Sequence, residues 1–107
     1  MPDVSKKDWK LFRERLPEWQ ERYMEKLIIK YVRMLSAPGN ASDHFWELEK
    51  RINRDKRHPG VMMELRKSEM PWDIASLIKK KVIKLDDLEG FSEDLIEMVQ
   101  RLLNINA

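Results

Sequence analysis

Histidine, serine and acidic side chains are the residues of this chain that could carry catalysis or hold a metal ion. Its two histidines, His44 and His58, stand 14 residues apart at opposite ends of a predicted helix, so one helix does not bring their rings together. Asp55 and His58 have helical i, i+3 spacing, but two ligands in a basic environment make a poor metal site. No Gly-x-Ser-x-Gly elbow and no glycine-rich phosphate loop is present. We therefore expect no catalytic residue, no metal site and no cofactor.

The densest basic segment is Lys50–His58, which we call the elbow. Its potential cations are Lys50, Arg51, Arg54, Lys56, Arg57 and His58. Such a cluster has a structural explanation, because cations in a last helical turn complement the negative end of the helix dipole. It also has a functional one, because lysine and arginine bind phosphates or an acidic protein surface.

Trp46 gives the same predicted helix a second feature. At about 100° per residue, Trp46 shares a face with Lys50, Asn53 and Arg57. It lies outside the apolar stripe, which comprises Phe45, Leu48 and Ile52. A tryptophan beside cations can stack on a base or anchor a protein interface. The alternative is that Trp46 packs against another helix, because most tryptophans in small domains are largely buried.

A second cationic row consists of Arg22, Lys26, Lys30 and Arg33, which share one helix face. Like charges at this spacing destabilise a helix by a few tenths of a kcal/mol per pair. The row is either a solvated stripe, relieved by nearby acids such as Glu18, or a contact for an anionic partner. The candidate partner-binding residues are Trp46, Lys50, Asn53, Arg54, Arg57, Arg22, Lys26, Lys30 and Arg33.

Composition limits the class of protein. The chain has 107 residues, 42% of them hydrophobic and 37% charged, with a net charge of +2, which suits one domain of amphipathic helices. The absence of cysteine excludes disulfides, thiolate catalysis and cysteine-based zinc sites. No apolar run reaches the ~18 residues of a membrane span, and the N-terminus has no secretory h-region. We expect a cytoplasmic protein without membrane contact.

Turn residues and helical periodicity predict an all-α fold, a compact single-domain bundle of five to six short helices. The domain is expected over 5–104, with flexible termini at 1–4 and 105–107. We expect two helices meeting at Pro17, although one kinked helix is the alternative. The second predicted helix, from Pro17 to about Leu35, is apolar around most of its circumference, which predicts burial of Ile28 and its neighbours.

The remaining predicted helices follow from caps and restarts. Ser42 or Asp43 is expected to cap a third helix that buries Leu48, and Pro59 to begin a fourth that runs to Ser68. A fifth restarts near Met70, and the last is capped by Ser92. Between these two, the acidic segment 86–89 is expected to form a single turn.

The strings FWELEKRI, NRDKRHPGV and MMELRKS, followed later by LDDLEGFSEDL, resemble a family of small uncharacterised all-helical bacterial proteins. Members of this family sometimes carry an automatic "multidrug transporter" label, which the absence of a membrane span in this sequence contradicts. The resemblance covers most of the chain and implies no site residues.

Without a reactive centre, the helical faces with aromatic and charged residues indicate a non-enzymatic helical binding module. We expect it to contact another protein, as an adaptor or inhibitor. The alternative is a nucleic-acid-binding protein that uses the elbow Lys50–His58. The sequence leaves the oligomeric state and the identity of the partner open.

Overall fold

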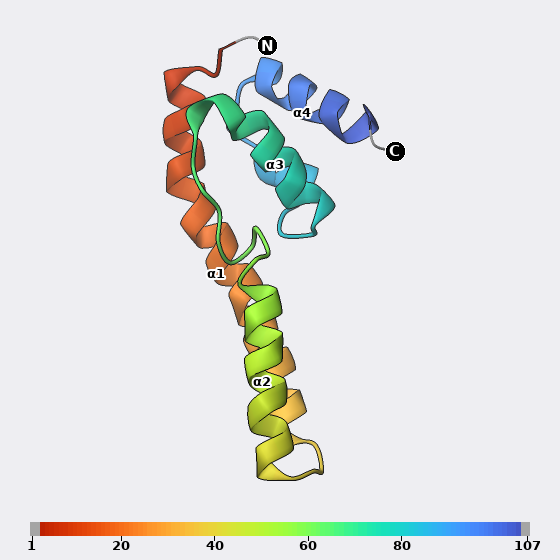
Figure 1. Cartoon of the computed structure of the whole chain (residues 1–107). Coiled ribbons are helices and arrows are strands. Elements are labelled where there is room, and N and C mark those ends of the chain that lie inside the picture. Colours follow the sequence, from red (N-terminus) through yellow and green to blue (C-terminus); the bar gives the residue numbers. More distant parts are fainter. Residues whose placement is uncertain (1–2, 106–107) are drawn as a thin grey trace.

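Helix α1 (Lys6–Ser36) is the longest element and runs through both halves of the molecule (Figure 1). The computed structural model describes residues 3–105. The other elements are α2 (Ala41–Asp55), a 3₁₀ turn η1 (Lys67–Glu69), α3 (Met70–Lys79), a second 3₁₀ turn η2 (Leu85–Leu88) and α4 (Glu93–Ile105). The prediction of an all-α protein is confirmed for the described residues. Within residues 3–105 the α-helices number four rather than the five or six that were predicted.

The molecule is elongated, whereas the sequence predicted a compact bundle. Its extents are 54 × 29 × 22 Å. The radius of gyration is 16.8 Å, whereas a compact domain of this length has about 13 Å. Figure 1 shows the reason: α1 and α2 form a rod that projects from a head made by the first half of α1 with α3 and α4.

The predicted break at Pro17 is wrong, because α1 continues through it. An internal proline costs a helix about 3 kcal/mol, since it removes one hydrogen bond and crowds the preceding turn. Pro17 itself is exposed, but Phe12, Leu16 and Trp19 on either side of it are buried in the head. Burying these side chains along one continuous stripe offsets the cost of the proline.

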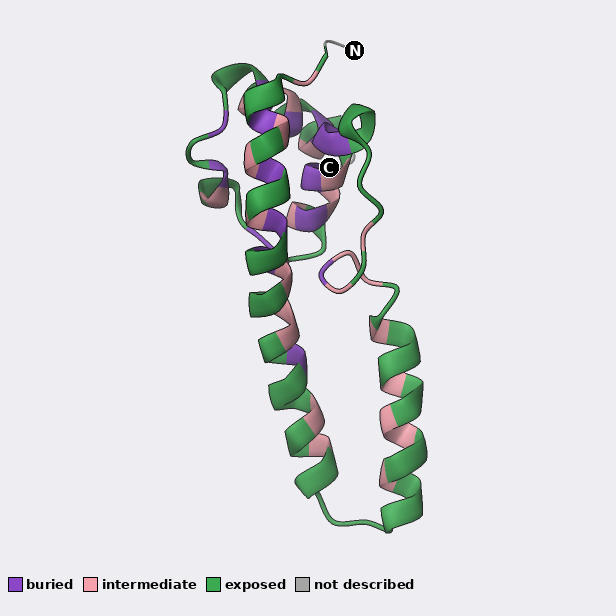
Figure 2. Cartoon of the chain, turned by 90° about the vertical axis from the view of Figure 1, so that its left-hand side faces the viewer, coloured by how far each residue is buried: buried purple, intermediate pink, exposed green. Residues whose placement is uncertain are grey.

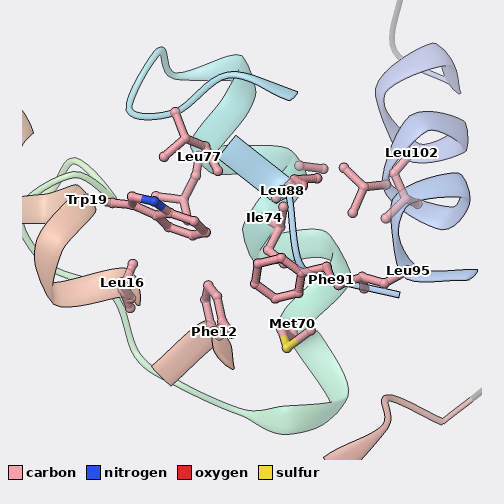
Figure 3. Close-up of a cluster of buried hydrophobic side chains, with 13 residues drawn as sticks. Phe12, Leu16, Trp19, Met70, Ile74, Leu77, Leu88, Phe91, Leu95 and Leu102 are labelled. Atoms are coloured by element: carbon pink, nitrogen blue, oxygen red, sulfur yellow. The ribbon is translucent and has the colours of Figure 1, made fainter. Parts of the chain in front are cut away.

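The hydrophobic core lies entirely in the head (Figure 3). Phe12, Leu16 and Trp19 of α1 face the buried side of α3, and α4 closes the other side of the cluster. The cluster is completed from α3, the following loop and α4 by Met70, Ile74, Ala75, Leu77, Ile83, Leu88, Phe91, Leu95, Val99 and Leu102. Burial of this kind stabilises by roughly 1.5 to 3 kcal/mol per large side chain.

Two polar contacts fasten α4 and its preceding loop to α1. Asp8 is buried, and its carboxylate accepts hydrogen bonds from the Ser92 backbone N–H at 2.9 Å and the Ser92 hydroxyl at 2.6 Å. Arg15 donates to the carbonyl of Asp87 at 3.1 Å and to that of Glu89. Ser92 also accepts from the Leu95 N–H at 3.2 Å, so the predicted cap of the last helix is confirmed.

The predicted fourth helix from Pro59 to Ser68 is absent. After α2 the chain turns through residues 56–61 and then runs without regular structure to η1. The turn lies against α1, where Gln20 donates to the Pro59 carbonyl at 3.1 Å. Gly60 is buried so closely on Tyr23 that an added Cβ would overlap the ring. Docking onto α1 therefore replaces the helical hydrogen bonds that the sequence pattern favoured.

Helix α3 begins at Met70 as predicted, and η2 at Leu85–Leu88 supplies the expected single turn. The loop between them turns at Lys81, whose φ of 64° lies in the left-handed region. The Val82 N–H reaches back to the Leu77 carbonyl at 2.9 Å, as in a helix end that usually uses glycine. Residues 1–2 and 106–107, part of the predicted flexible termini, lie outside the described residues.

Candidate functional site

The projecting rod is a helical hairpin, defined here as residues 22–36 of α1 together with α2. Figure 2 shows its surface as mostly exposed, in contrast to the head. No residue of α2 is buried, and Leu27 is the one buried residue on its partner segment. The expected burial of Leu48 and Ile28 is wrong: Leu48 is half-buried, and Ile28 exposes 56% of its surface.

The contact between the two helices, which we call the seam, follows a three-four spacing. It is formed by the less exposed residues Met24, Leu27, Tyr31 and Met34 of α1 and His44, Leu48, Arg51 and Asp55 of α2. Three of the four α2 residues are polar or ionisable. Because such side chains gain little from burial, the seam alone stabilises α2 weakly.

One polar pair in the seam is well defined. The Tyr31 hydroxyl donates to the Asp55 carboxylate at 2.5 Å, and Arg54 bonds the other oxygen of that carboxylate at 3.0 Å. Burial and the hydrogen bond to Asp55 raise the pKa of Tyr31 to about 12. Burial opposes ionisation of Asp55, but the bonds from Tyr31 and Arg54 outweigh it and hold the pKa of Asp55 below its usual value. The pair fixes α2 against α1 without creating a reactive group.

An apolar face runs along one side of the hairpin. Each of its residues directly follows a seam residue, and antiparallel helices place such positions on the same side of the pair. The apolar face comprises Ile28, Val32 and Leu35 of α1 and Phe45 and Ile52 of α2, with exposed fractions between 42% and 61%. Ile29 and Trp46 flank it and are also more than half exposed. Soluble monomers rarely expose so many large apolar side chains in one patch.

The four residues of the predicted face, Trp46, Lys50, Asn53 and Arg57, are all exposed. Trp46 exposes 61% of its surface and packs edge-on against Phe45, with ring centroids 4.9 Å apart. The alternative that Trp46 packs against another helix is therefore wrong. These four residues lie on the side of α2 that points away from α1. Trp46 borders the apolar face, whereas Lys50 and Arg57 lie farther around the helix from it.

The opposite side of the hairpin, which we call the basic side, carries residues that directly precede seam residues. They are Lys26, Lys30 and Arg33 of α1 and Lys50 and Arg54 of α2, so part of the cationic row and part of the elbow lie on one side. A shallow hollow of about 710 Å³ lies there, between Lys30, Arg33 and Arg51. Glu47 pairs with Arg51 at 3.0 Å and neutralises part of the charge.

Arg22 lies nearer to the head. Its guanidinium is 3.9 Å from the Asp87 carboxylate, and a cavity of about 820 Å³ separates the head from the hairpin at this point. Arg22, Lys26, Lys81 and Lys84 line that cavity. The basic side of the hairpin therefore continues onto the head.

The two histidines are not brought together. His58 stacks on Tyr23, with centroids 4.5 Å apart and planes at 4°, and its Nδ1 accepts the Gly60 N–H at 3.0 Å. Burial and nearby Lys80 lower the pKa of His58. His44 lies at the far end of α2, near Gly39. Within residues 3–105, no group of three or more metal-ligating side chains gathers.

Comparisons with known proteins give no assignment: no family model, curated protein or solved structure matches the chain. Among residues 3–105, none of the helices has the length and apolar character that crossing a bilayer requires. The resemblance to small helical bacterial proteins stays a prediction.

Sequence reasoning missed the apolar face. The signal was present in the unusually apolar segment 27–35, which was interpreted as a buried helix because a helix that is apolar around most of its circumference usually packs against several neighbours. The structure gives this segment one polar neighbour, α2. Apolar residues that the core does not need then lie on the surface.

Proposed function

We propose that this protein is a non-enzymatic binding module, of the adaptor or inhibitor type, that contacts a protein chain through the apolar face of its hairpin. The observation that supports this most directly is the exposure of Ile28, Val32, Leu35, Phe45 and Ile52 on one side of a projecting rod. The head has its own core and holds the rod away from it, so the face is sterically free.

The physical argument concerns the stability of α2. A helix of 15 residues is marginal in water unless an amphipathic face is covered. On the α2 side the seam covers mainly polar side chains, with Leu48 half-buried among them, whereas Phe45, Trp46 and Ile52 of α2 face solvent. A partner on the apolar face would bury large aromatic and aliphatic side chains, which dominate the energetics of protein interfaces.

The proposal is tested by a photo-crosslinking amino acid at Val32, with Gln100 on the exposed surface of α4 as the matched control position. We expect capture of a defined protein from Val32 and not from Gln100. The captured protein is then purified, and Phe45→Ser should weaken its binding at least tenfold while Gln100→Ser leaves it unchanged. Equal capture from both positions, or binding that ignores Phe45→Ser, would refute the proposal.

A second candidate function, nucleic-acid binding, is favoured by the convergence of cations on the basic side. Lys26, Lys30 and Arg33 lie on the same side as Arg54 of the elbow, and the cationic lining continues to Lys81 and Lys84 on the head. Lysine and arginine bind phosphates without reading sequence, and such binding weakens steeply with salt.

Fluorescence anisotropy with single-stranded and duplex oligonucleotides at two salt concentrations tests this candidate. Lys30→Ala and Arg54→Ala should each weaken binding and lower the salt slope by about 1 per lost phosphate contact. Lys7→Ala, an exposed lysine at the far end of α1, is the matched control. No binding to either nucleic acid at low salt would eliminate the candidate.

A further inference from the structure

We propose that the occupant of the apolar face is the same face of a second copy of this chain, with the two hairpins antiparallel in a four-helix bundle. The inference rests on the proposed function, because it takes the apolar face to be a docking surface and names what covers it. Four features of the described residues support it: the size of the face, its position relative to the head, the charges beside it and its construction from two helices.

The size of the face matches a dimer interface. Its five residues with Ile29 and Trp46 expose 42% to 61% of their surfaces. Their exposed area is roughly 700 Å² when the aliphatic side chains are counted near the lower end of the range of about 150 to 250 Å² that holds for aromatic side chains. A standard protein interface buries about 800 Å² on each partner. Pairing two copies of the face together with the flanking Ile29 and Trp46 therefore gives an interface that approaches ordinary size without help from the head.

The position of the face leaves it open to a second hairpin. The stripe of α1 that enters the head, which includes Phe12, Leu16 and Trp19, continues along the helix at the same three-four spacing to Lys26 and Lys30. The head therefore lies on the basic side. Ile28 and Val32 are about half a turn away from that stripe, so two molecules can pair through them with both heads outside.

The charges along the α1 stripe favour one relative direction of the two hairpins. The stripe of α1 opposite the head consists of Glu14, Glu18, Glu21 and Glu25, followed at the same spacing by Ile28, Val32 and Leu35. In a parallel pair the acidic halves of the two stripes would lie together and repel each other. In an antiparallel pair the apolar halves overlap, and each acidic half extends beyond the tip of the partner's hairpin.

The construction of the face favours a second hairpin over a single helix. The apolar residues come from both α1 and α2, so a flat two-helix surface is presented. A single partner helix would cover one groove and leave residues on one side exposed. Another hairpin covers both helices at once and produces the four-helix arrangement in which apolar positions of each helix meet two neighbours. An isologous twofold contact is also the commonest symmetry of protein oligomers.

Analytical ultracentrifugation of the purified chain tests the second copy. We expect a mass twice that of the 12.9 kDa chain at tens of micromolar, with dissociation on dilution. Val32→Glu should shift the dissociation constant at least tenfold toward the monomer, with circular dichroism of the head helices retained. Gln100→Glu adds the same charge at an exposed site outside the face and should leave the dimer intact. A single-chain mass at the highest concentration, or a dimer indifferent to Val32→Glu, would overturn the inference.

The chain has no cysteine, so single substitutions report the direction of pairing. Glu49 lies midway between Phe45 and Ile52, close to the expected twofold axis, whereas Glu14 lies far from it. Under mild oxidation Glu49→Cys should form a disulfide-linked dimer and Glu14→Cys should not. Linkage through Glu14→Cys, or through neither residue in a dimeric protein, would overturn the antiparallel arrangement.

A monomeric chain that still captures a different protein at Val32 would end this inference and leave the proposed function standing. Capture that fails at Val32 in a chain that dimerises elsewhere would end both.

Discussion

At the scale of single residues, two large aliphatic residues that look equivalent in the sequence, Leu77 and Ile28, differ in burial. Leu77 is fully buried in the head, whereas Ile28 exposes 56% of its surface on the hairpin. Leu77→Ala should lower the free energy of unfolding by about 2 to 5 kcal/mol, because it leaves a cavity in a packed core. Ile28→Ala should lower it by less than about 1 kcal/mol in the monomer.

Urea unfolding at low protein concentration measures both changes. Equal losses for the two variants would show that the hairpin is buried within the monomer. A loss for Ile28→Ala that grows with protein concentration would instead report burial between copies.

Asp73 gives the head a dependence on pH. Burial, with a contribution from Glu69, raises the pKa of Asp73 to about 6, and one oxygen of its carboxylate has no hydrogen-bond partner. The folded state therefore binds a proton more tightly than the unfolded state, whose carboxyl has the ordinary pKa of 3.8. This group's contribution to stability is full below about pH 4 and is lost as the pH rises through about 6.

Asp73→Asn should remove that loss. The free energy of unfolding of the variant, compared with that of the wild type, should therefore rise more at pH 7 than at pH 4. Chemical denaturation at the two pH values measures the difference. The lowered pKa of His58 acts in the opposite sense below about pH 6.5, so comparison with the wild type at each pH isolates Asp73. A gain that does not depend on pH would contradict the assignment.

At the scale of elements, α1 is more stable as one helix than its proline suggests. Pro17 is exposed and interior to the helix, so it serves no packing role that alanine would lose. Pro17→Ala should restore the missing backbone hydrogen bond and raise the free energy of unfolding by about 1 to 3 kcal/mol. Thermal unfolding followed by circular dichroism tests this, and a lowered melting temperature would show that α1 needs the proline's geometry.

At the scale of the whole molecule, the head and the hairpin should differ in local stability. The amides of α3 and α4 are held by a packed core, whereas α2 has no buried residue. Hydrogen exchange should therefore be fast in α2 and slow in α3 and α4 at micromolar concentration. Rising concentration should protect α2 selectively if two hairpins pair. Uniform exchange across the helices would contradict this division.

Several elements could be predicted from the sequence because their signals are local. Ser92 caps α4 and Met70 begins α3, as local signals alone indicated. The exposed row of Lys26, Lys30 and Arg33 likewise follows from helical periodicity. These features depend on residues within a few positions of one another, so no knowledge of the fold was needed.

The tertiary structure decided everything that depends on which helices meet. Continuous packing of Phe12, Leu16 and Trp19 on the head carries α1 through Pro17, although the local rule at that residue predicts a break. Close contact of Gly60 with Tyr23 holds the chain after α2 in a turn where a proline restart predicted a helix. The sequence by itself determined that segment 27–35 is helical and apolar. Whether that surface is buried or exposed was decided by the number of helices packed around it, and in this chain the one neighbour, α2, leaves it open.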